Sequence, residues 1–176
     1  MALRKIVIEG DPILRKKARA LEKVSDKERE IFLDMLDTMR EADGVGLAAP
    51  QVGLLKQMIV VEASDPDDIE KAKEEDREPL KLLYFLANPE IIEEEGCQEG
   101  VEGCLSVPGF VGTVKRPMKI KVKALDYHGE PVEIEVDRFL AVAISHEMDH
   151  LRGVLFTDKA SDVKEEEYED SIHGDS

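Results

Sequence analysis

The sequence predicts an α+β fold, with small antiparallel β-sheets packed around one central helix in the C-terminal half of the chain. Short apolar runs typical of buried strands occur at residues 57–61 and 82–87. Residues 119–136 alternate polar and apolar side chains on both sides of a turn, which is typical of a β-hairpin. A helical pattern then runs from Asp137 to about Arg152 and supplies the central helix.

The N-terminal region predicts one short strand and one short helix. Residues 5–8 (Lys-Ile-Val-Ile) have the composition of a strand. Asp11 followed by Pro12 is a common way for a helix to begin, so we expect a helix through about Ala20.

A longer helix is expected after Ser25. Ser25 and Glu28 form a capping-box pattern, in which each side chain can bond to the backbone of the other residue. Apolar residues then recur on one helical face, namely Ile31, Phe32, Met35, Leu36 and Met39. The helix should end at Asp43-Gly44, because glycine readily adopts the left-handed conformation that closes many helices.

Charge and composition exclude several classes of protein. The 176 residues include 40 acidic and 24 basic side chains, and a net charge of −16 repels phosphate backbones, so we expect no direct binding of nucleic acid. No apolar run approaches the roughly 20 residues that span a membrane, and the first residues lack a secretory signal, so we expect a cytoplasmic protein.

The negative charge is concentrated in two segments. Residues 62–79 carry nine acidic and three basic side chains, and residues 158–176 carry eight acidic and two basic ones. Both segments are poor in large apolar residues, so we interpret the first as a solvated insertion and the second as an acidic tail, frayed or partly helical. The remaining chain, residues 1–157, is expected to be a single domain.

The central helix contains a metal-binding pattern. His146 and His150 are four residues apart, so both imidazoles project from one face and can reach one metal ion. Glu147 is adjacent to the first histidine, where it could move protons to and from a metal-bound water. Phe139 and Val142 lie on the same stripe, so we expect this stripe and both imidazoles to be buried.

A hydrolytic metal site usually has three protein ligands, so a third is needed. The remaining histidines, His128 in the hairpin turn and His173 in the acidic tail, are poorly placed. Cys104 lies in an apolar, turn-rich segment suited to a loop beside the site, whereas Cys97 lies in a polar segment, so we choose Cys104 and interpret Cys97 as an exposed free thiol. Alternatively, Cys104 is an inert buried residue, and carbonyl groups or Asp149 satisfy the helical histidines.

A third feature is the run Gly-Val-Gly-Leu-Ala-Ala-Pro-Gln at residues 44–51. Its glycines and alanines permit close approach of the backbone to another group. A phosphate-binding loop is the rival interpretation, but no Lys-Ser/Thr pair follows and a helix, not a strand, precedes. Gln51 offers an amide donor beside this backbone, unless it only faces solvent after the helix end.

Together these three segments resemble the peptide deformylase family. That family has a Gly-x-Gly-x-Ala-Ala-x-Gln loop, a Glu-Gly-Cys-Leu-Ser loop and a His-Glu-x-x-His helix, which residues 44–51, 102–106 and 146–150 match in this order. The resemblance implies that the formyl group is removed from the N-terminal formylmethionine of newly synthesised polypeptides, and that formate is released. It also implies Fe²⁺ as the cofactor, for which Zn²⁺, Ni²⁺ or Co²⁺ can substitute.

The resemblance assigns roles to the motif residues. Cys104, His146 and His150 would bind the metal, and Glu147 would act as general base and then as general acid. Two imidazoles and a thiolate suit zinc as well as iron, so the residues alone do not choose the metal. Leu105, through its backbone N–H, would help to stabilise the oxyanion of the reaction, as would the amide of Gln51.

The methionine side chain of the substrate needs an apolar pocket beside the metal. The substrate-binding residues expected from the three motifs and the helix stripe are Gly44, Val45, Gly46, Gly103, Phe139, Val142 and His146. The expected partners are N-formylmethionyl peptides, as nascent chains close to the ribosome, and we expect a monomer. Because the tail at residues 158–176 is acidic, we do not expect it to dock on the ribosome.

Two other functions use the same residues. A zinc metallopeptidase with this helix motif would need a third ligand after His150, and His173 is the histidine that follows it. A structural or regulatory metal module would leave Glu147 and Gln51 without a purpose. Ser145 also departs from the family, which commonly has Gln there; the smaller side chain would weaken support of the site, but it replaces neither a ligand nor the base.

Overall fold

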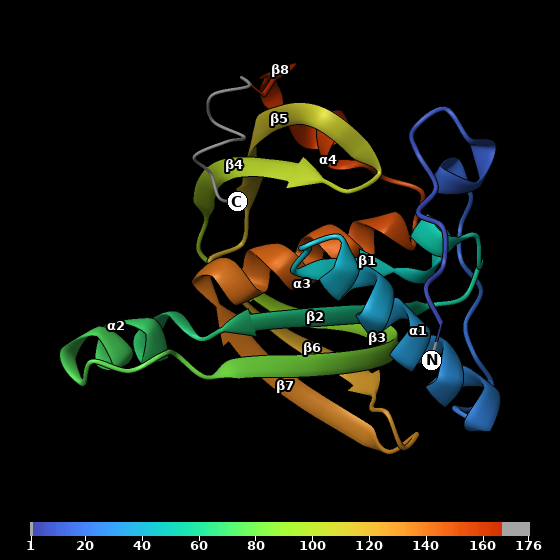
Figure 1. Cartoon of the computed structure of the whole chain (residues 1–176), viewed down its shortest axis with the longest axis horizontal. Helices are drawn as coiled ribbons and strands as arrows, with labels where there is room; N and C mark the ends of the chain where they lie inside the picture. Colours follow the sequence, from blue (N-terminus) through green and yellow to red (C-terminus); the bar gives the residue numbers. More distant parts are fainter. Residues whose placement is uncertain (1, 167–176) are drawn as a thin grey trace.

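The computed structural model describes residues 2–166, which form two antiparallel β-sheets with α3 between them (Figure 1). The elements in chain order are η1 (Pro12–Arg15), α1 (Asp26–Glu41), β1 (Gly46–Ala48), η2 (Ala49–Val52), β2 (Met58–Ser64), α2 (Pro66–Glu74), β3 (Lys81–Glu95), β4 (Gln98–Cys104), β5 (Val107–Arg116), β6 (Lys119–Leu125), β7 (Pro131–Asp137), α3 (Arg138–His150), α4 (Phe156–Lys159) and β8 (Ser161–Glu165). The five-stranded sheet has the order β1-β2-β3-β6-β7 and the three-stranded sheet the order β4-β5-β8. The predicted α+β class is confirmed.

Strand β2 shows how the layers are held together. Its Ile59 and Val61 pack in one apolar cluster with α3, whereas Met58 and Val60 pack in a second cluster with α1. The five-stranded sheet is therefore covered by a helix on each face, which explains why residues 58–61 of β2 form a continuous apolar run and do not alternate. On the far side of α3 lies the three-stranded sheet, whose own small cluster includes Leu155 of the loop before α4.

Several predicted elements are present in the described chain. The apolar runs belong to β2 and β3, and the predicted hairpin is the pair β6 and β7. The carboxylate of Glu28 accepts the backbone N–H of Ser25 at 3.0 Å, as the capping box predicts, whereas the hydroxyl of Ser25 donates to the same carboxylate. Strand β3 extends beyond residue 87, because the chain passes Asn88-Pro89 as an irregularity in the ladder with β6.

The N-terminal predictions need correction. Residues 5–8 are not a strand, since the segment makes isolated contacts such as Val7 N–H to the Gln51 carbonyl (2.7 Å) and joins no ladder. The predicted helix is only the single turn η1, which ends at Arg15 because Lys16 is already extended. At the end of α1 the left-handed residue is Asp43, with φ 58°, and not Gly44.

The two acidic segments also contain regular structure. The insertion carries α2, which projects from the body beyond β2 and β3 (Figure 1). Asp65 caps α2 by accepting the N–H of Asp67. In the tail, residues 161–165 pair with β5 as the edge strand β8, and residues 167–176 lie outside the described chain. None of the helices in residues 2–166 combines the length and the apolar character needed to cross a membrane.

The end of α3 is closed by Gly153. Its φ is +77°, and a Cβ there would lie 2.5 Å from the carbonyl oxygen of Arg15, so the end of η1 packs directly against this glycine. The N–H of Ala18 also donates to the Leu151 carbonyl at 2.9 Å. These contacts fix the N-terminal segment against the helix that carries the two histidines.

We expect Gly153→Ala to destabilise the fold much more than Gly53→Ala. Both residues have positive φ, which costs about 1–2 kcal/mol for a residue with a Cβ, but a Cβ at Gly53 meets no atom within 4 Å. Guanidinium unfolding of both variants measures the difference, which is the cost of the contact with Arg15. Equal losses of unfolding free energy in the two variants would contradict this account of Gly153.

Candidate metal centre

The residues singled out in the sequence come together around one cavity of about 790 Å³. It is lined by the segment after α1, by η2, by β4 and the start of β5 with the turn between them, and by one face of α3. The expected site residues that line it are Gly44, Val45, Gly46, Gln51, Gly103, Cys104, Leu105, Phe139, Val142, His146 and Glu147. His150 is buried one turn further along α3, beside Cys104.

Cys104, His146 and His150 form a group that can hold a metal ion. One donor atom from each residue lies within 4.8 Å of the other two. Among residues 2–166, no other group of three or more His, Cys, Asp or Glu side chains is arranged so that it could hold a metal ion. The Cys104 sulfur lies 3.4 Å from Nε2 of His150. Both histidines are buried, whereas His128 is exposed and His173 lies outside the described chain.

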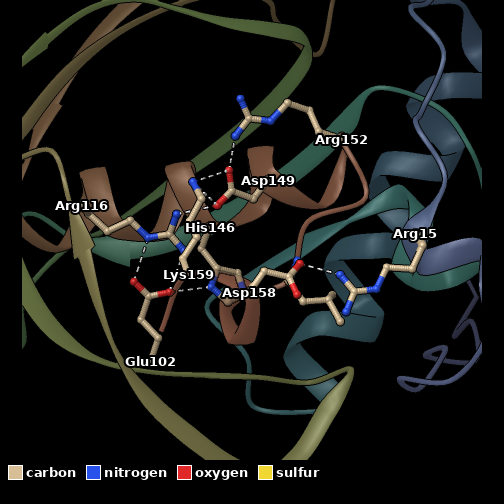
Figure 2. Close-up of polar contacts among 9 residues, drawn as sticks. Arg15, Glu102, Arg116, His146, Asp149, Arg152, Asp158 and Lys159 are labelled. Atoms are coloured by element: carbon tan, nitrogen blue, oxygen red, sulfur yellow. Dashed lines mark hydrogen bonds and ion pairs between the residues drawn. The ribbon is translucent and has the colours of Figure 1, made fainter. Parts of the chain in front are cut away.

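A buried charged network orients the first histidine (Figure 2). Glu102 Oε1 lies 2.9 Å from Nδ1 of His146, which leaves Nε2 of this imidazole for the metal. Arg116 of β5 donates two hydrogen bonds to Glu102, at 2.8 and 2.9 Å, and one to Asp149 at 2.6 Å. One guanidinium therefore joins Glu102 of β4, which contacts His146, to Asp149 of α3.

Asp149 has further partners outside this pair. Arg152 and Lys159 contact its carboxylate, the latter at 3.0 Å (Figure 2). In the same helix as Lys159, Asp158 pairs with Arg15. Asp149 therefore serves the charged network, and it does not satisfy the histidines as the alternative interpretation proposed.

The electrostatics of the site favour a cation. Burial opposes the charged form of Glu102, but its bonds with Arg116 and His146 hold its pKa at about 2. Burial lowers the pKa of His146, yet Cys104 and Glu102 raise it to about 10, because both stabilise positive charge on the ring. Burial and the neighbouring His146 lower the pKa of His150 to about 3, so this imidazole is neutral and keeps a lone pair.

This donor set fits a divalent transition-metal ion. Two imidazoles and a thiolate are suitable ligands for iron, zinc, nickel or cobalt. Nε2 of His150 faces the Cys104 sulfur at 3.4 Å, so a ring nitrogen and a thiol are directed at one position. A bound cation there would be coordinated by both atoms, which are otherwise largely removed from water.

The carboxylate of Glu147 occupies the space that a side chain at position 46 would fill. A Cβ at Gly46 would lie 2.5 Å from Oε2 of Glu147 and 2.9 Å from its Cδ. Glu147 is 5% exposed, and its Oε1 has no hydrogen-bond partner within residues 2–166. Burial raises its pKa to about 7, so near neutrality this carboxyl group can both accept and donate a proton.

Gln51 is part of the site and does not face solvent, being 1% exposed. Its Oε1 accepts the N–H of Ala48 at 2.9 Å, which orients the amide. Its Nε2 then lies 3.1 Å from the hydroxyl of Ser106 and 3.6 Å from the sulfur of Cys104. An amide donor is therefore held next to a metal ligand.

The expectation that the whole stripe on α3 is buried needs correction. His146 and His150 are buried, but Phe139 is 46% exposed and Val142 is half-buried, because this end of the stripe opens into the cavity and not into the core. Ser145 is buried, and its hydroxyl has no hydrogen-bond partner in the described part of the chain. Within residues 2–166 this hydroxyl therefore makes no hydrogen bond to a residue of the site.

Sequence reasoning missed three residues of the site. Arg116 lies in a strand that the pattern did not reveal, and no spacing connects it to the histidines. Glu102 was visible as the first residue of its motif, but nothing indicated that it bonds to a ligand. Ser106 was also in a motif, and its contact with Gln51 depends on the fold.

Comparison with known proteins decides what kind of site this is. The family model described as polypeptide deformylase matches residues 3–166. The chain belongs to the polypeptide deformylase family. Members of this family remove the N-formyl group from nascent peptides and are metal-dependent hydrolases. The resemblance inferred from the three motifs is thereby confirmed.

Individual deformylases match over most of the chain. The peptide deformylase of Alkaliphilus metalliredigens (strain QYMF) is 48% identical over 159 residues, which cover 90% of this chain and 97% of that protein. A peptide deformylase structure from Legionella pneumophila is 42% identical with a TM-score of 0.78, and covers 92% of this chain and 88% of its own. A structure from Synechococcus elongatus, in complex with actinonin, is 38% identical with a TM-score of 0.78, over 90% and 79% of the two chains.

We expect Arg116→Met to weaken both the fold and the metal centre. The change leaves Glu102 and Asp149 buried without their shared cation, which costs about 3–5 kcal/mol and should reduce metal affinity by roughly 10–100-fold. Denaturant unfolding and competition titration with Zn²⁺ measure the two effects.

The neighbouring exposed residue supplies the control for this prediction. Lys115→Met removes a cation from the same strand without touching Glu102, so it should change stability by less than about 0.5 kcal/mol. If Arg116→Met behaved like Lys115→Met in both measurements, the network would not support the metal centre.

Proposed function

We propose that this deformylase hydrolyses the formyl amide of N-formylmethionyl peptides at the Cys104, His146 and His150 centre, with Glu147 moving the protons. The observation that carries the proposal is the convergence of this triad, an unpaired buried carboxylate and an oriented amide on one cavity. Structural metal sites need neither of the last two groups.

The three ligands would hold a divalent cation at the inner end of the cavity. Such a cation lowers the pKa of a water molecule toward neutrality and polarises a carbonyl group. Glu147 would accept the proton of the attacking water and later donate it to the leaving amine. Its buried position beside Gly46 keeps the carboxylate in place for both transfers.

The oxyanion of the reaction would be stabilised by hydrogen-bond donors beside Cys104. Nε2 of Gln51 lies beside the Cys104 sulfur, and Leu105 follows this ligand directly and lines the same cavity. We assign the Gln51 amide and the Leu105 backbone N–H as donors to the developing negative charge. Loss of one such donor typically costs about 3–4 kcal/mol in the barrier.

The side chain of the formylmethionine would occupy the apolar part of the cavity. Phe139 and Val142 of α3 form one wall, and Val45 lies on the segment between α1 and β1. His146 would lie at the inner end, and the small residues Gly44, Gly46 and Gly103 would let the peptide backbone approach closely. The actinonin complex of the Synechococcus elongatus enzyme supports a ligand in this cavity, and we infer that actinonin also binds here.

Several broader assignments accompany this mechanism. Fe²⁺ is our choice of metal on the basis of the family motifs, with Zn²⁺, Ni²⁺ or Co²⁺ able to substitute, since the donor set fits all four. We infer a cytoplasmic monomer that meets nascent chains near the ribosome without binding RNA directly. The net charge of −16 and the exposed thiol of Cys97 support this environment.

Formate release from formyl-Met-Ala-Ser tests the assigned roles. Glu147→Gln keeps the shape of the side chain but cannot carry the proton, so kcat should fall by about 10²–10⁴-fold with metal content unchanged. Cys104→Ala should lose metal, whereas Cys97→Ala should keep both metal and activity. Activity that survived Glu147→Gln, or full metal content in Cys104→Ala, would overturn the corresponding role.

Gly46→Ala tests how Glu147 is positioned. The added Cβ must displace a carboxylate that it would otherwise meet at 2.5 Å, and a displacement of about 1 Å at a reacting group can cost roughly 10²-fold in rate. We expect lower kcat at unchanged metal content. Gly44→Ala is the comparator, because its Cβ meets the flexible tip of Leu105 and should cost less. A rate for Gly46→Ala equal to that of the unmodified protein would contradict the assignment.

A further inference from the structure

Strand β4 and helix α3 run side by side along the cavity, held by one contact at each end. Nε2 of Gln98 donates to the Arg138 carbonyl at 3.0 Å, and Glu102 bonds to His146 at 2.9 Å. Four strand residues span about 13 Å and eight helical residues about 12 Å, so the two elements keep the same register between these contacts. The midpoint of the strand, Gly100, therefore lies opposite the midpoint of the helix segment, Val142.

Gly100 faces the helix. Side chains alternate along a strand, so Gly100 shares its face with Gln98 and Glu102, both of which contact α3. The ladder with β5 is regular from Gln98 to Gly103, so no irregularity reverses this order. Gly100 and Val142 both line the cavity.

Neither backbone nor packing requires a glycine at this position. Gly100 has no positive φ, unlike Gly96 before β4 and Gly109 in β5. A Cβ built at Gly100 has no atom within 4 Å, in contrast to Gly46 and Gly112, where a Cβ would collide. Glycine in the middle of a strand also weakens it. What the glycine provides is open space between β4 and α3.

We propose that Gly100 widens the pocket for the N-terminal side chain, so that this deformylase also accepts formylated peptides whose first side chain is bulkier than methionine, such as phenylalanine. The inference rests on the proposed function and names a residue that sets its specificity. The walls beside the open space are Val142 and the aromatic ring of Phe139, and both favour an apolar or aromatic side chain over a charged one.

The test compares formyl-Phe-Ala-Ser with formyl-Met-Ala-Ser on the metal-loaded protein and on the variants Gly100→Ala and Gly100→Val. We expect the unmodified protein to show kcat/KM values for the two peptides within about tenfold of each other. Gly100→Val should lower the value for the phenylalanine peptide by roughly 10–200-fold and the value for the methionine peptide by less than about threefold. Gly100→Ala should be intermediate, and it remains informative if the valine variant is unstable.

Thr113→Val is the matched control, because it adds a valine to the same sheet at a residue that pairs with Val101 and does not line the cavity. It should leave the ratio of the two peptides unchanged. The inference is overturned if the unmodified protein cleaves the methionine peptide but not the phenylalanine peptide. It is also overturned if both Gly100 variants lower the two rates equally. Failure of the unmodified protein on both peptides would overturn the proposed function and this inference with it.

Discussion

The guanidinium group of Arg116 is the interaction on which the metal centre depends. Glu102 of β4 and Asp149 of α3 are both buried, and two buried carboxylates would repel each other without a shared cation. Arg116 sits between them and comes from a third element, β5, so one planar group connects the small sheet to the helix that carries the histidines. Burying these charges is costly, and their full pairing makes the arrangement stable.

The contact of Arg116 with Glu102 and Asp149 bears on the positions of the candidate metal ligands. Glu102 orients His146, and two residues later the same chain segment delivers Cys104 to His150. The helix sets the spacing of the two imidazoles, and the network helps to set how far the cysteine loop lies from them. The catalytic centre and the packing of the small sheet on α3 therefore draw on the same contacts, and neither can be altered alone.

Much of this architecture could be read from the residues, for reasons that are local. The hairpin of β6 and β7, the capping box at Ser25 and the pair of histidines on α3 all rest on short-range periodicity or spacing. Strands β4 and β5 were not predicted, because their glycines and prolines hide the alternation and they become strands by pairing with each other. Residues 5–8 look like a strand in composition but find no ladder to join.

The charged network of Arg116, Glu102 and Asp149 could not be predicted from the sequence for a related reason. In the sequence Arg116 looks no different from the neighbouring Lys115, and its partners lie 14 and 33 positions away in the chain. The acidic segment at residues 62–79 was interpreted only as a solvated insertion, because charge alone does not distinguish a solvated helix from a solvated coil. It contains α2, a short helix stabilised by its Asp65 cap. Long-range partners of this kind are decided by the fold as a whole.

The contact between Gly46 and Glu147 has a consequence for how this chain can vary. A position that carries no side chain can only be filled, so every substitution at Gly46 adds atoms where the carboxylate already lies. No residue is smaller than glycine, so no substitution at Gly46 leaves the space for Glu147 unchanged. A neighbour can yield only if Glu147 moves, and Glu147 is fixed between two metal ligands on its helix. The position of this carboxylate therefore depends on the absence of a side chain in a neighbouring segment of the chain.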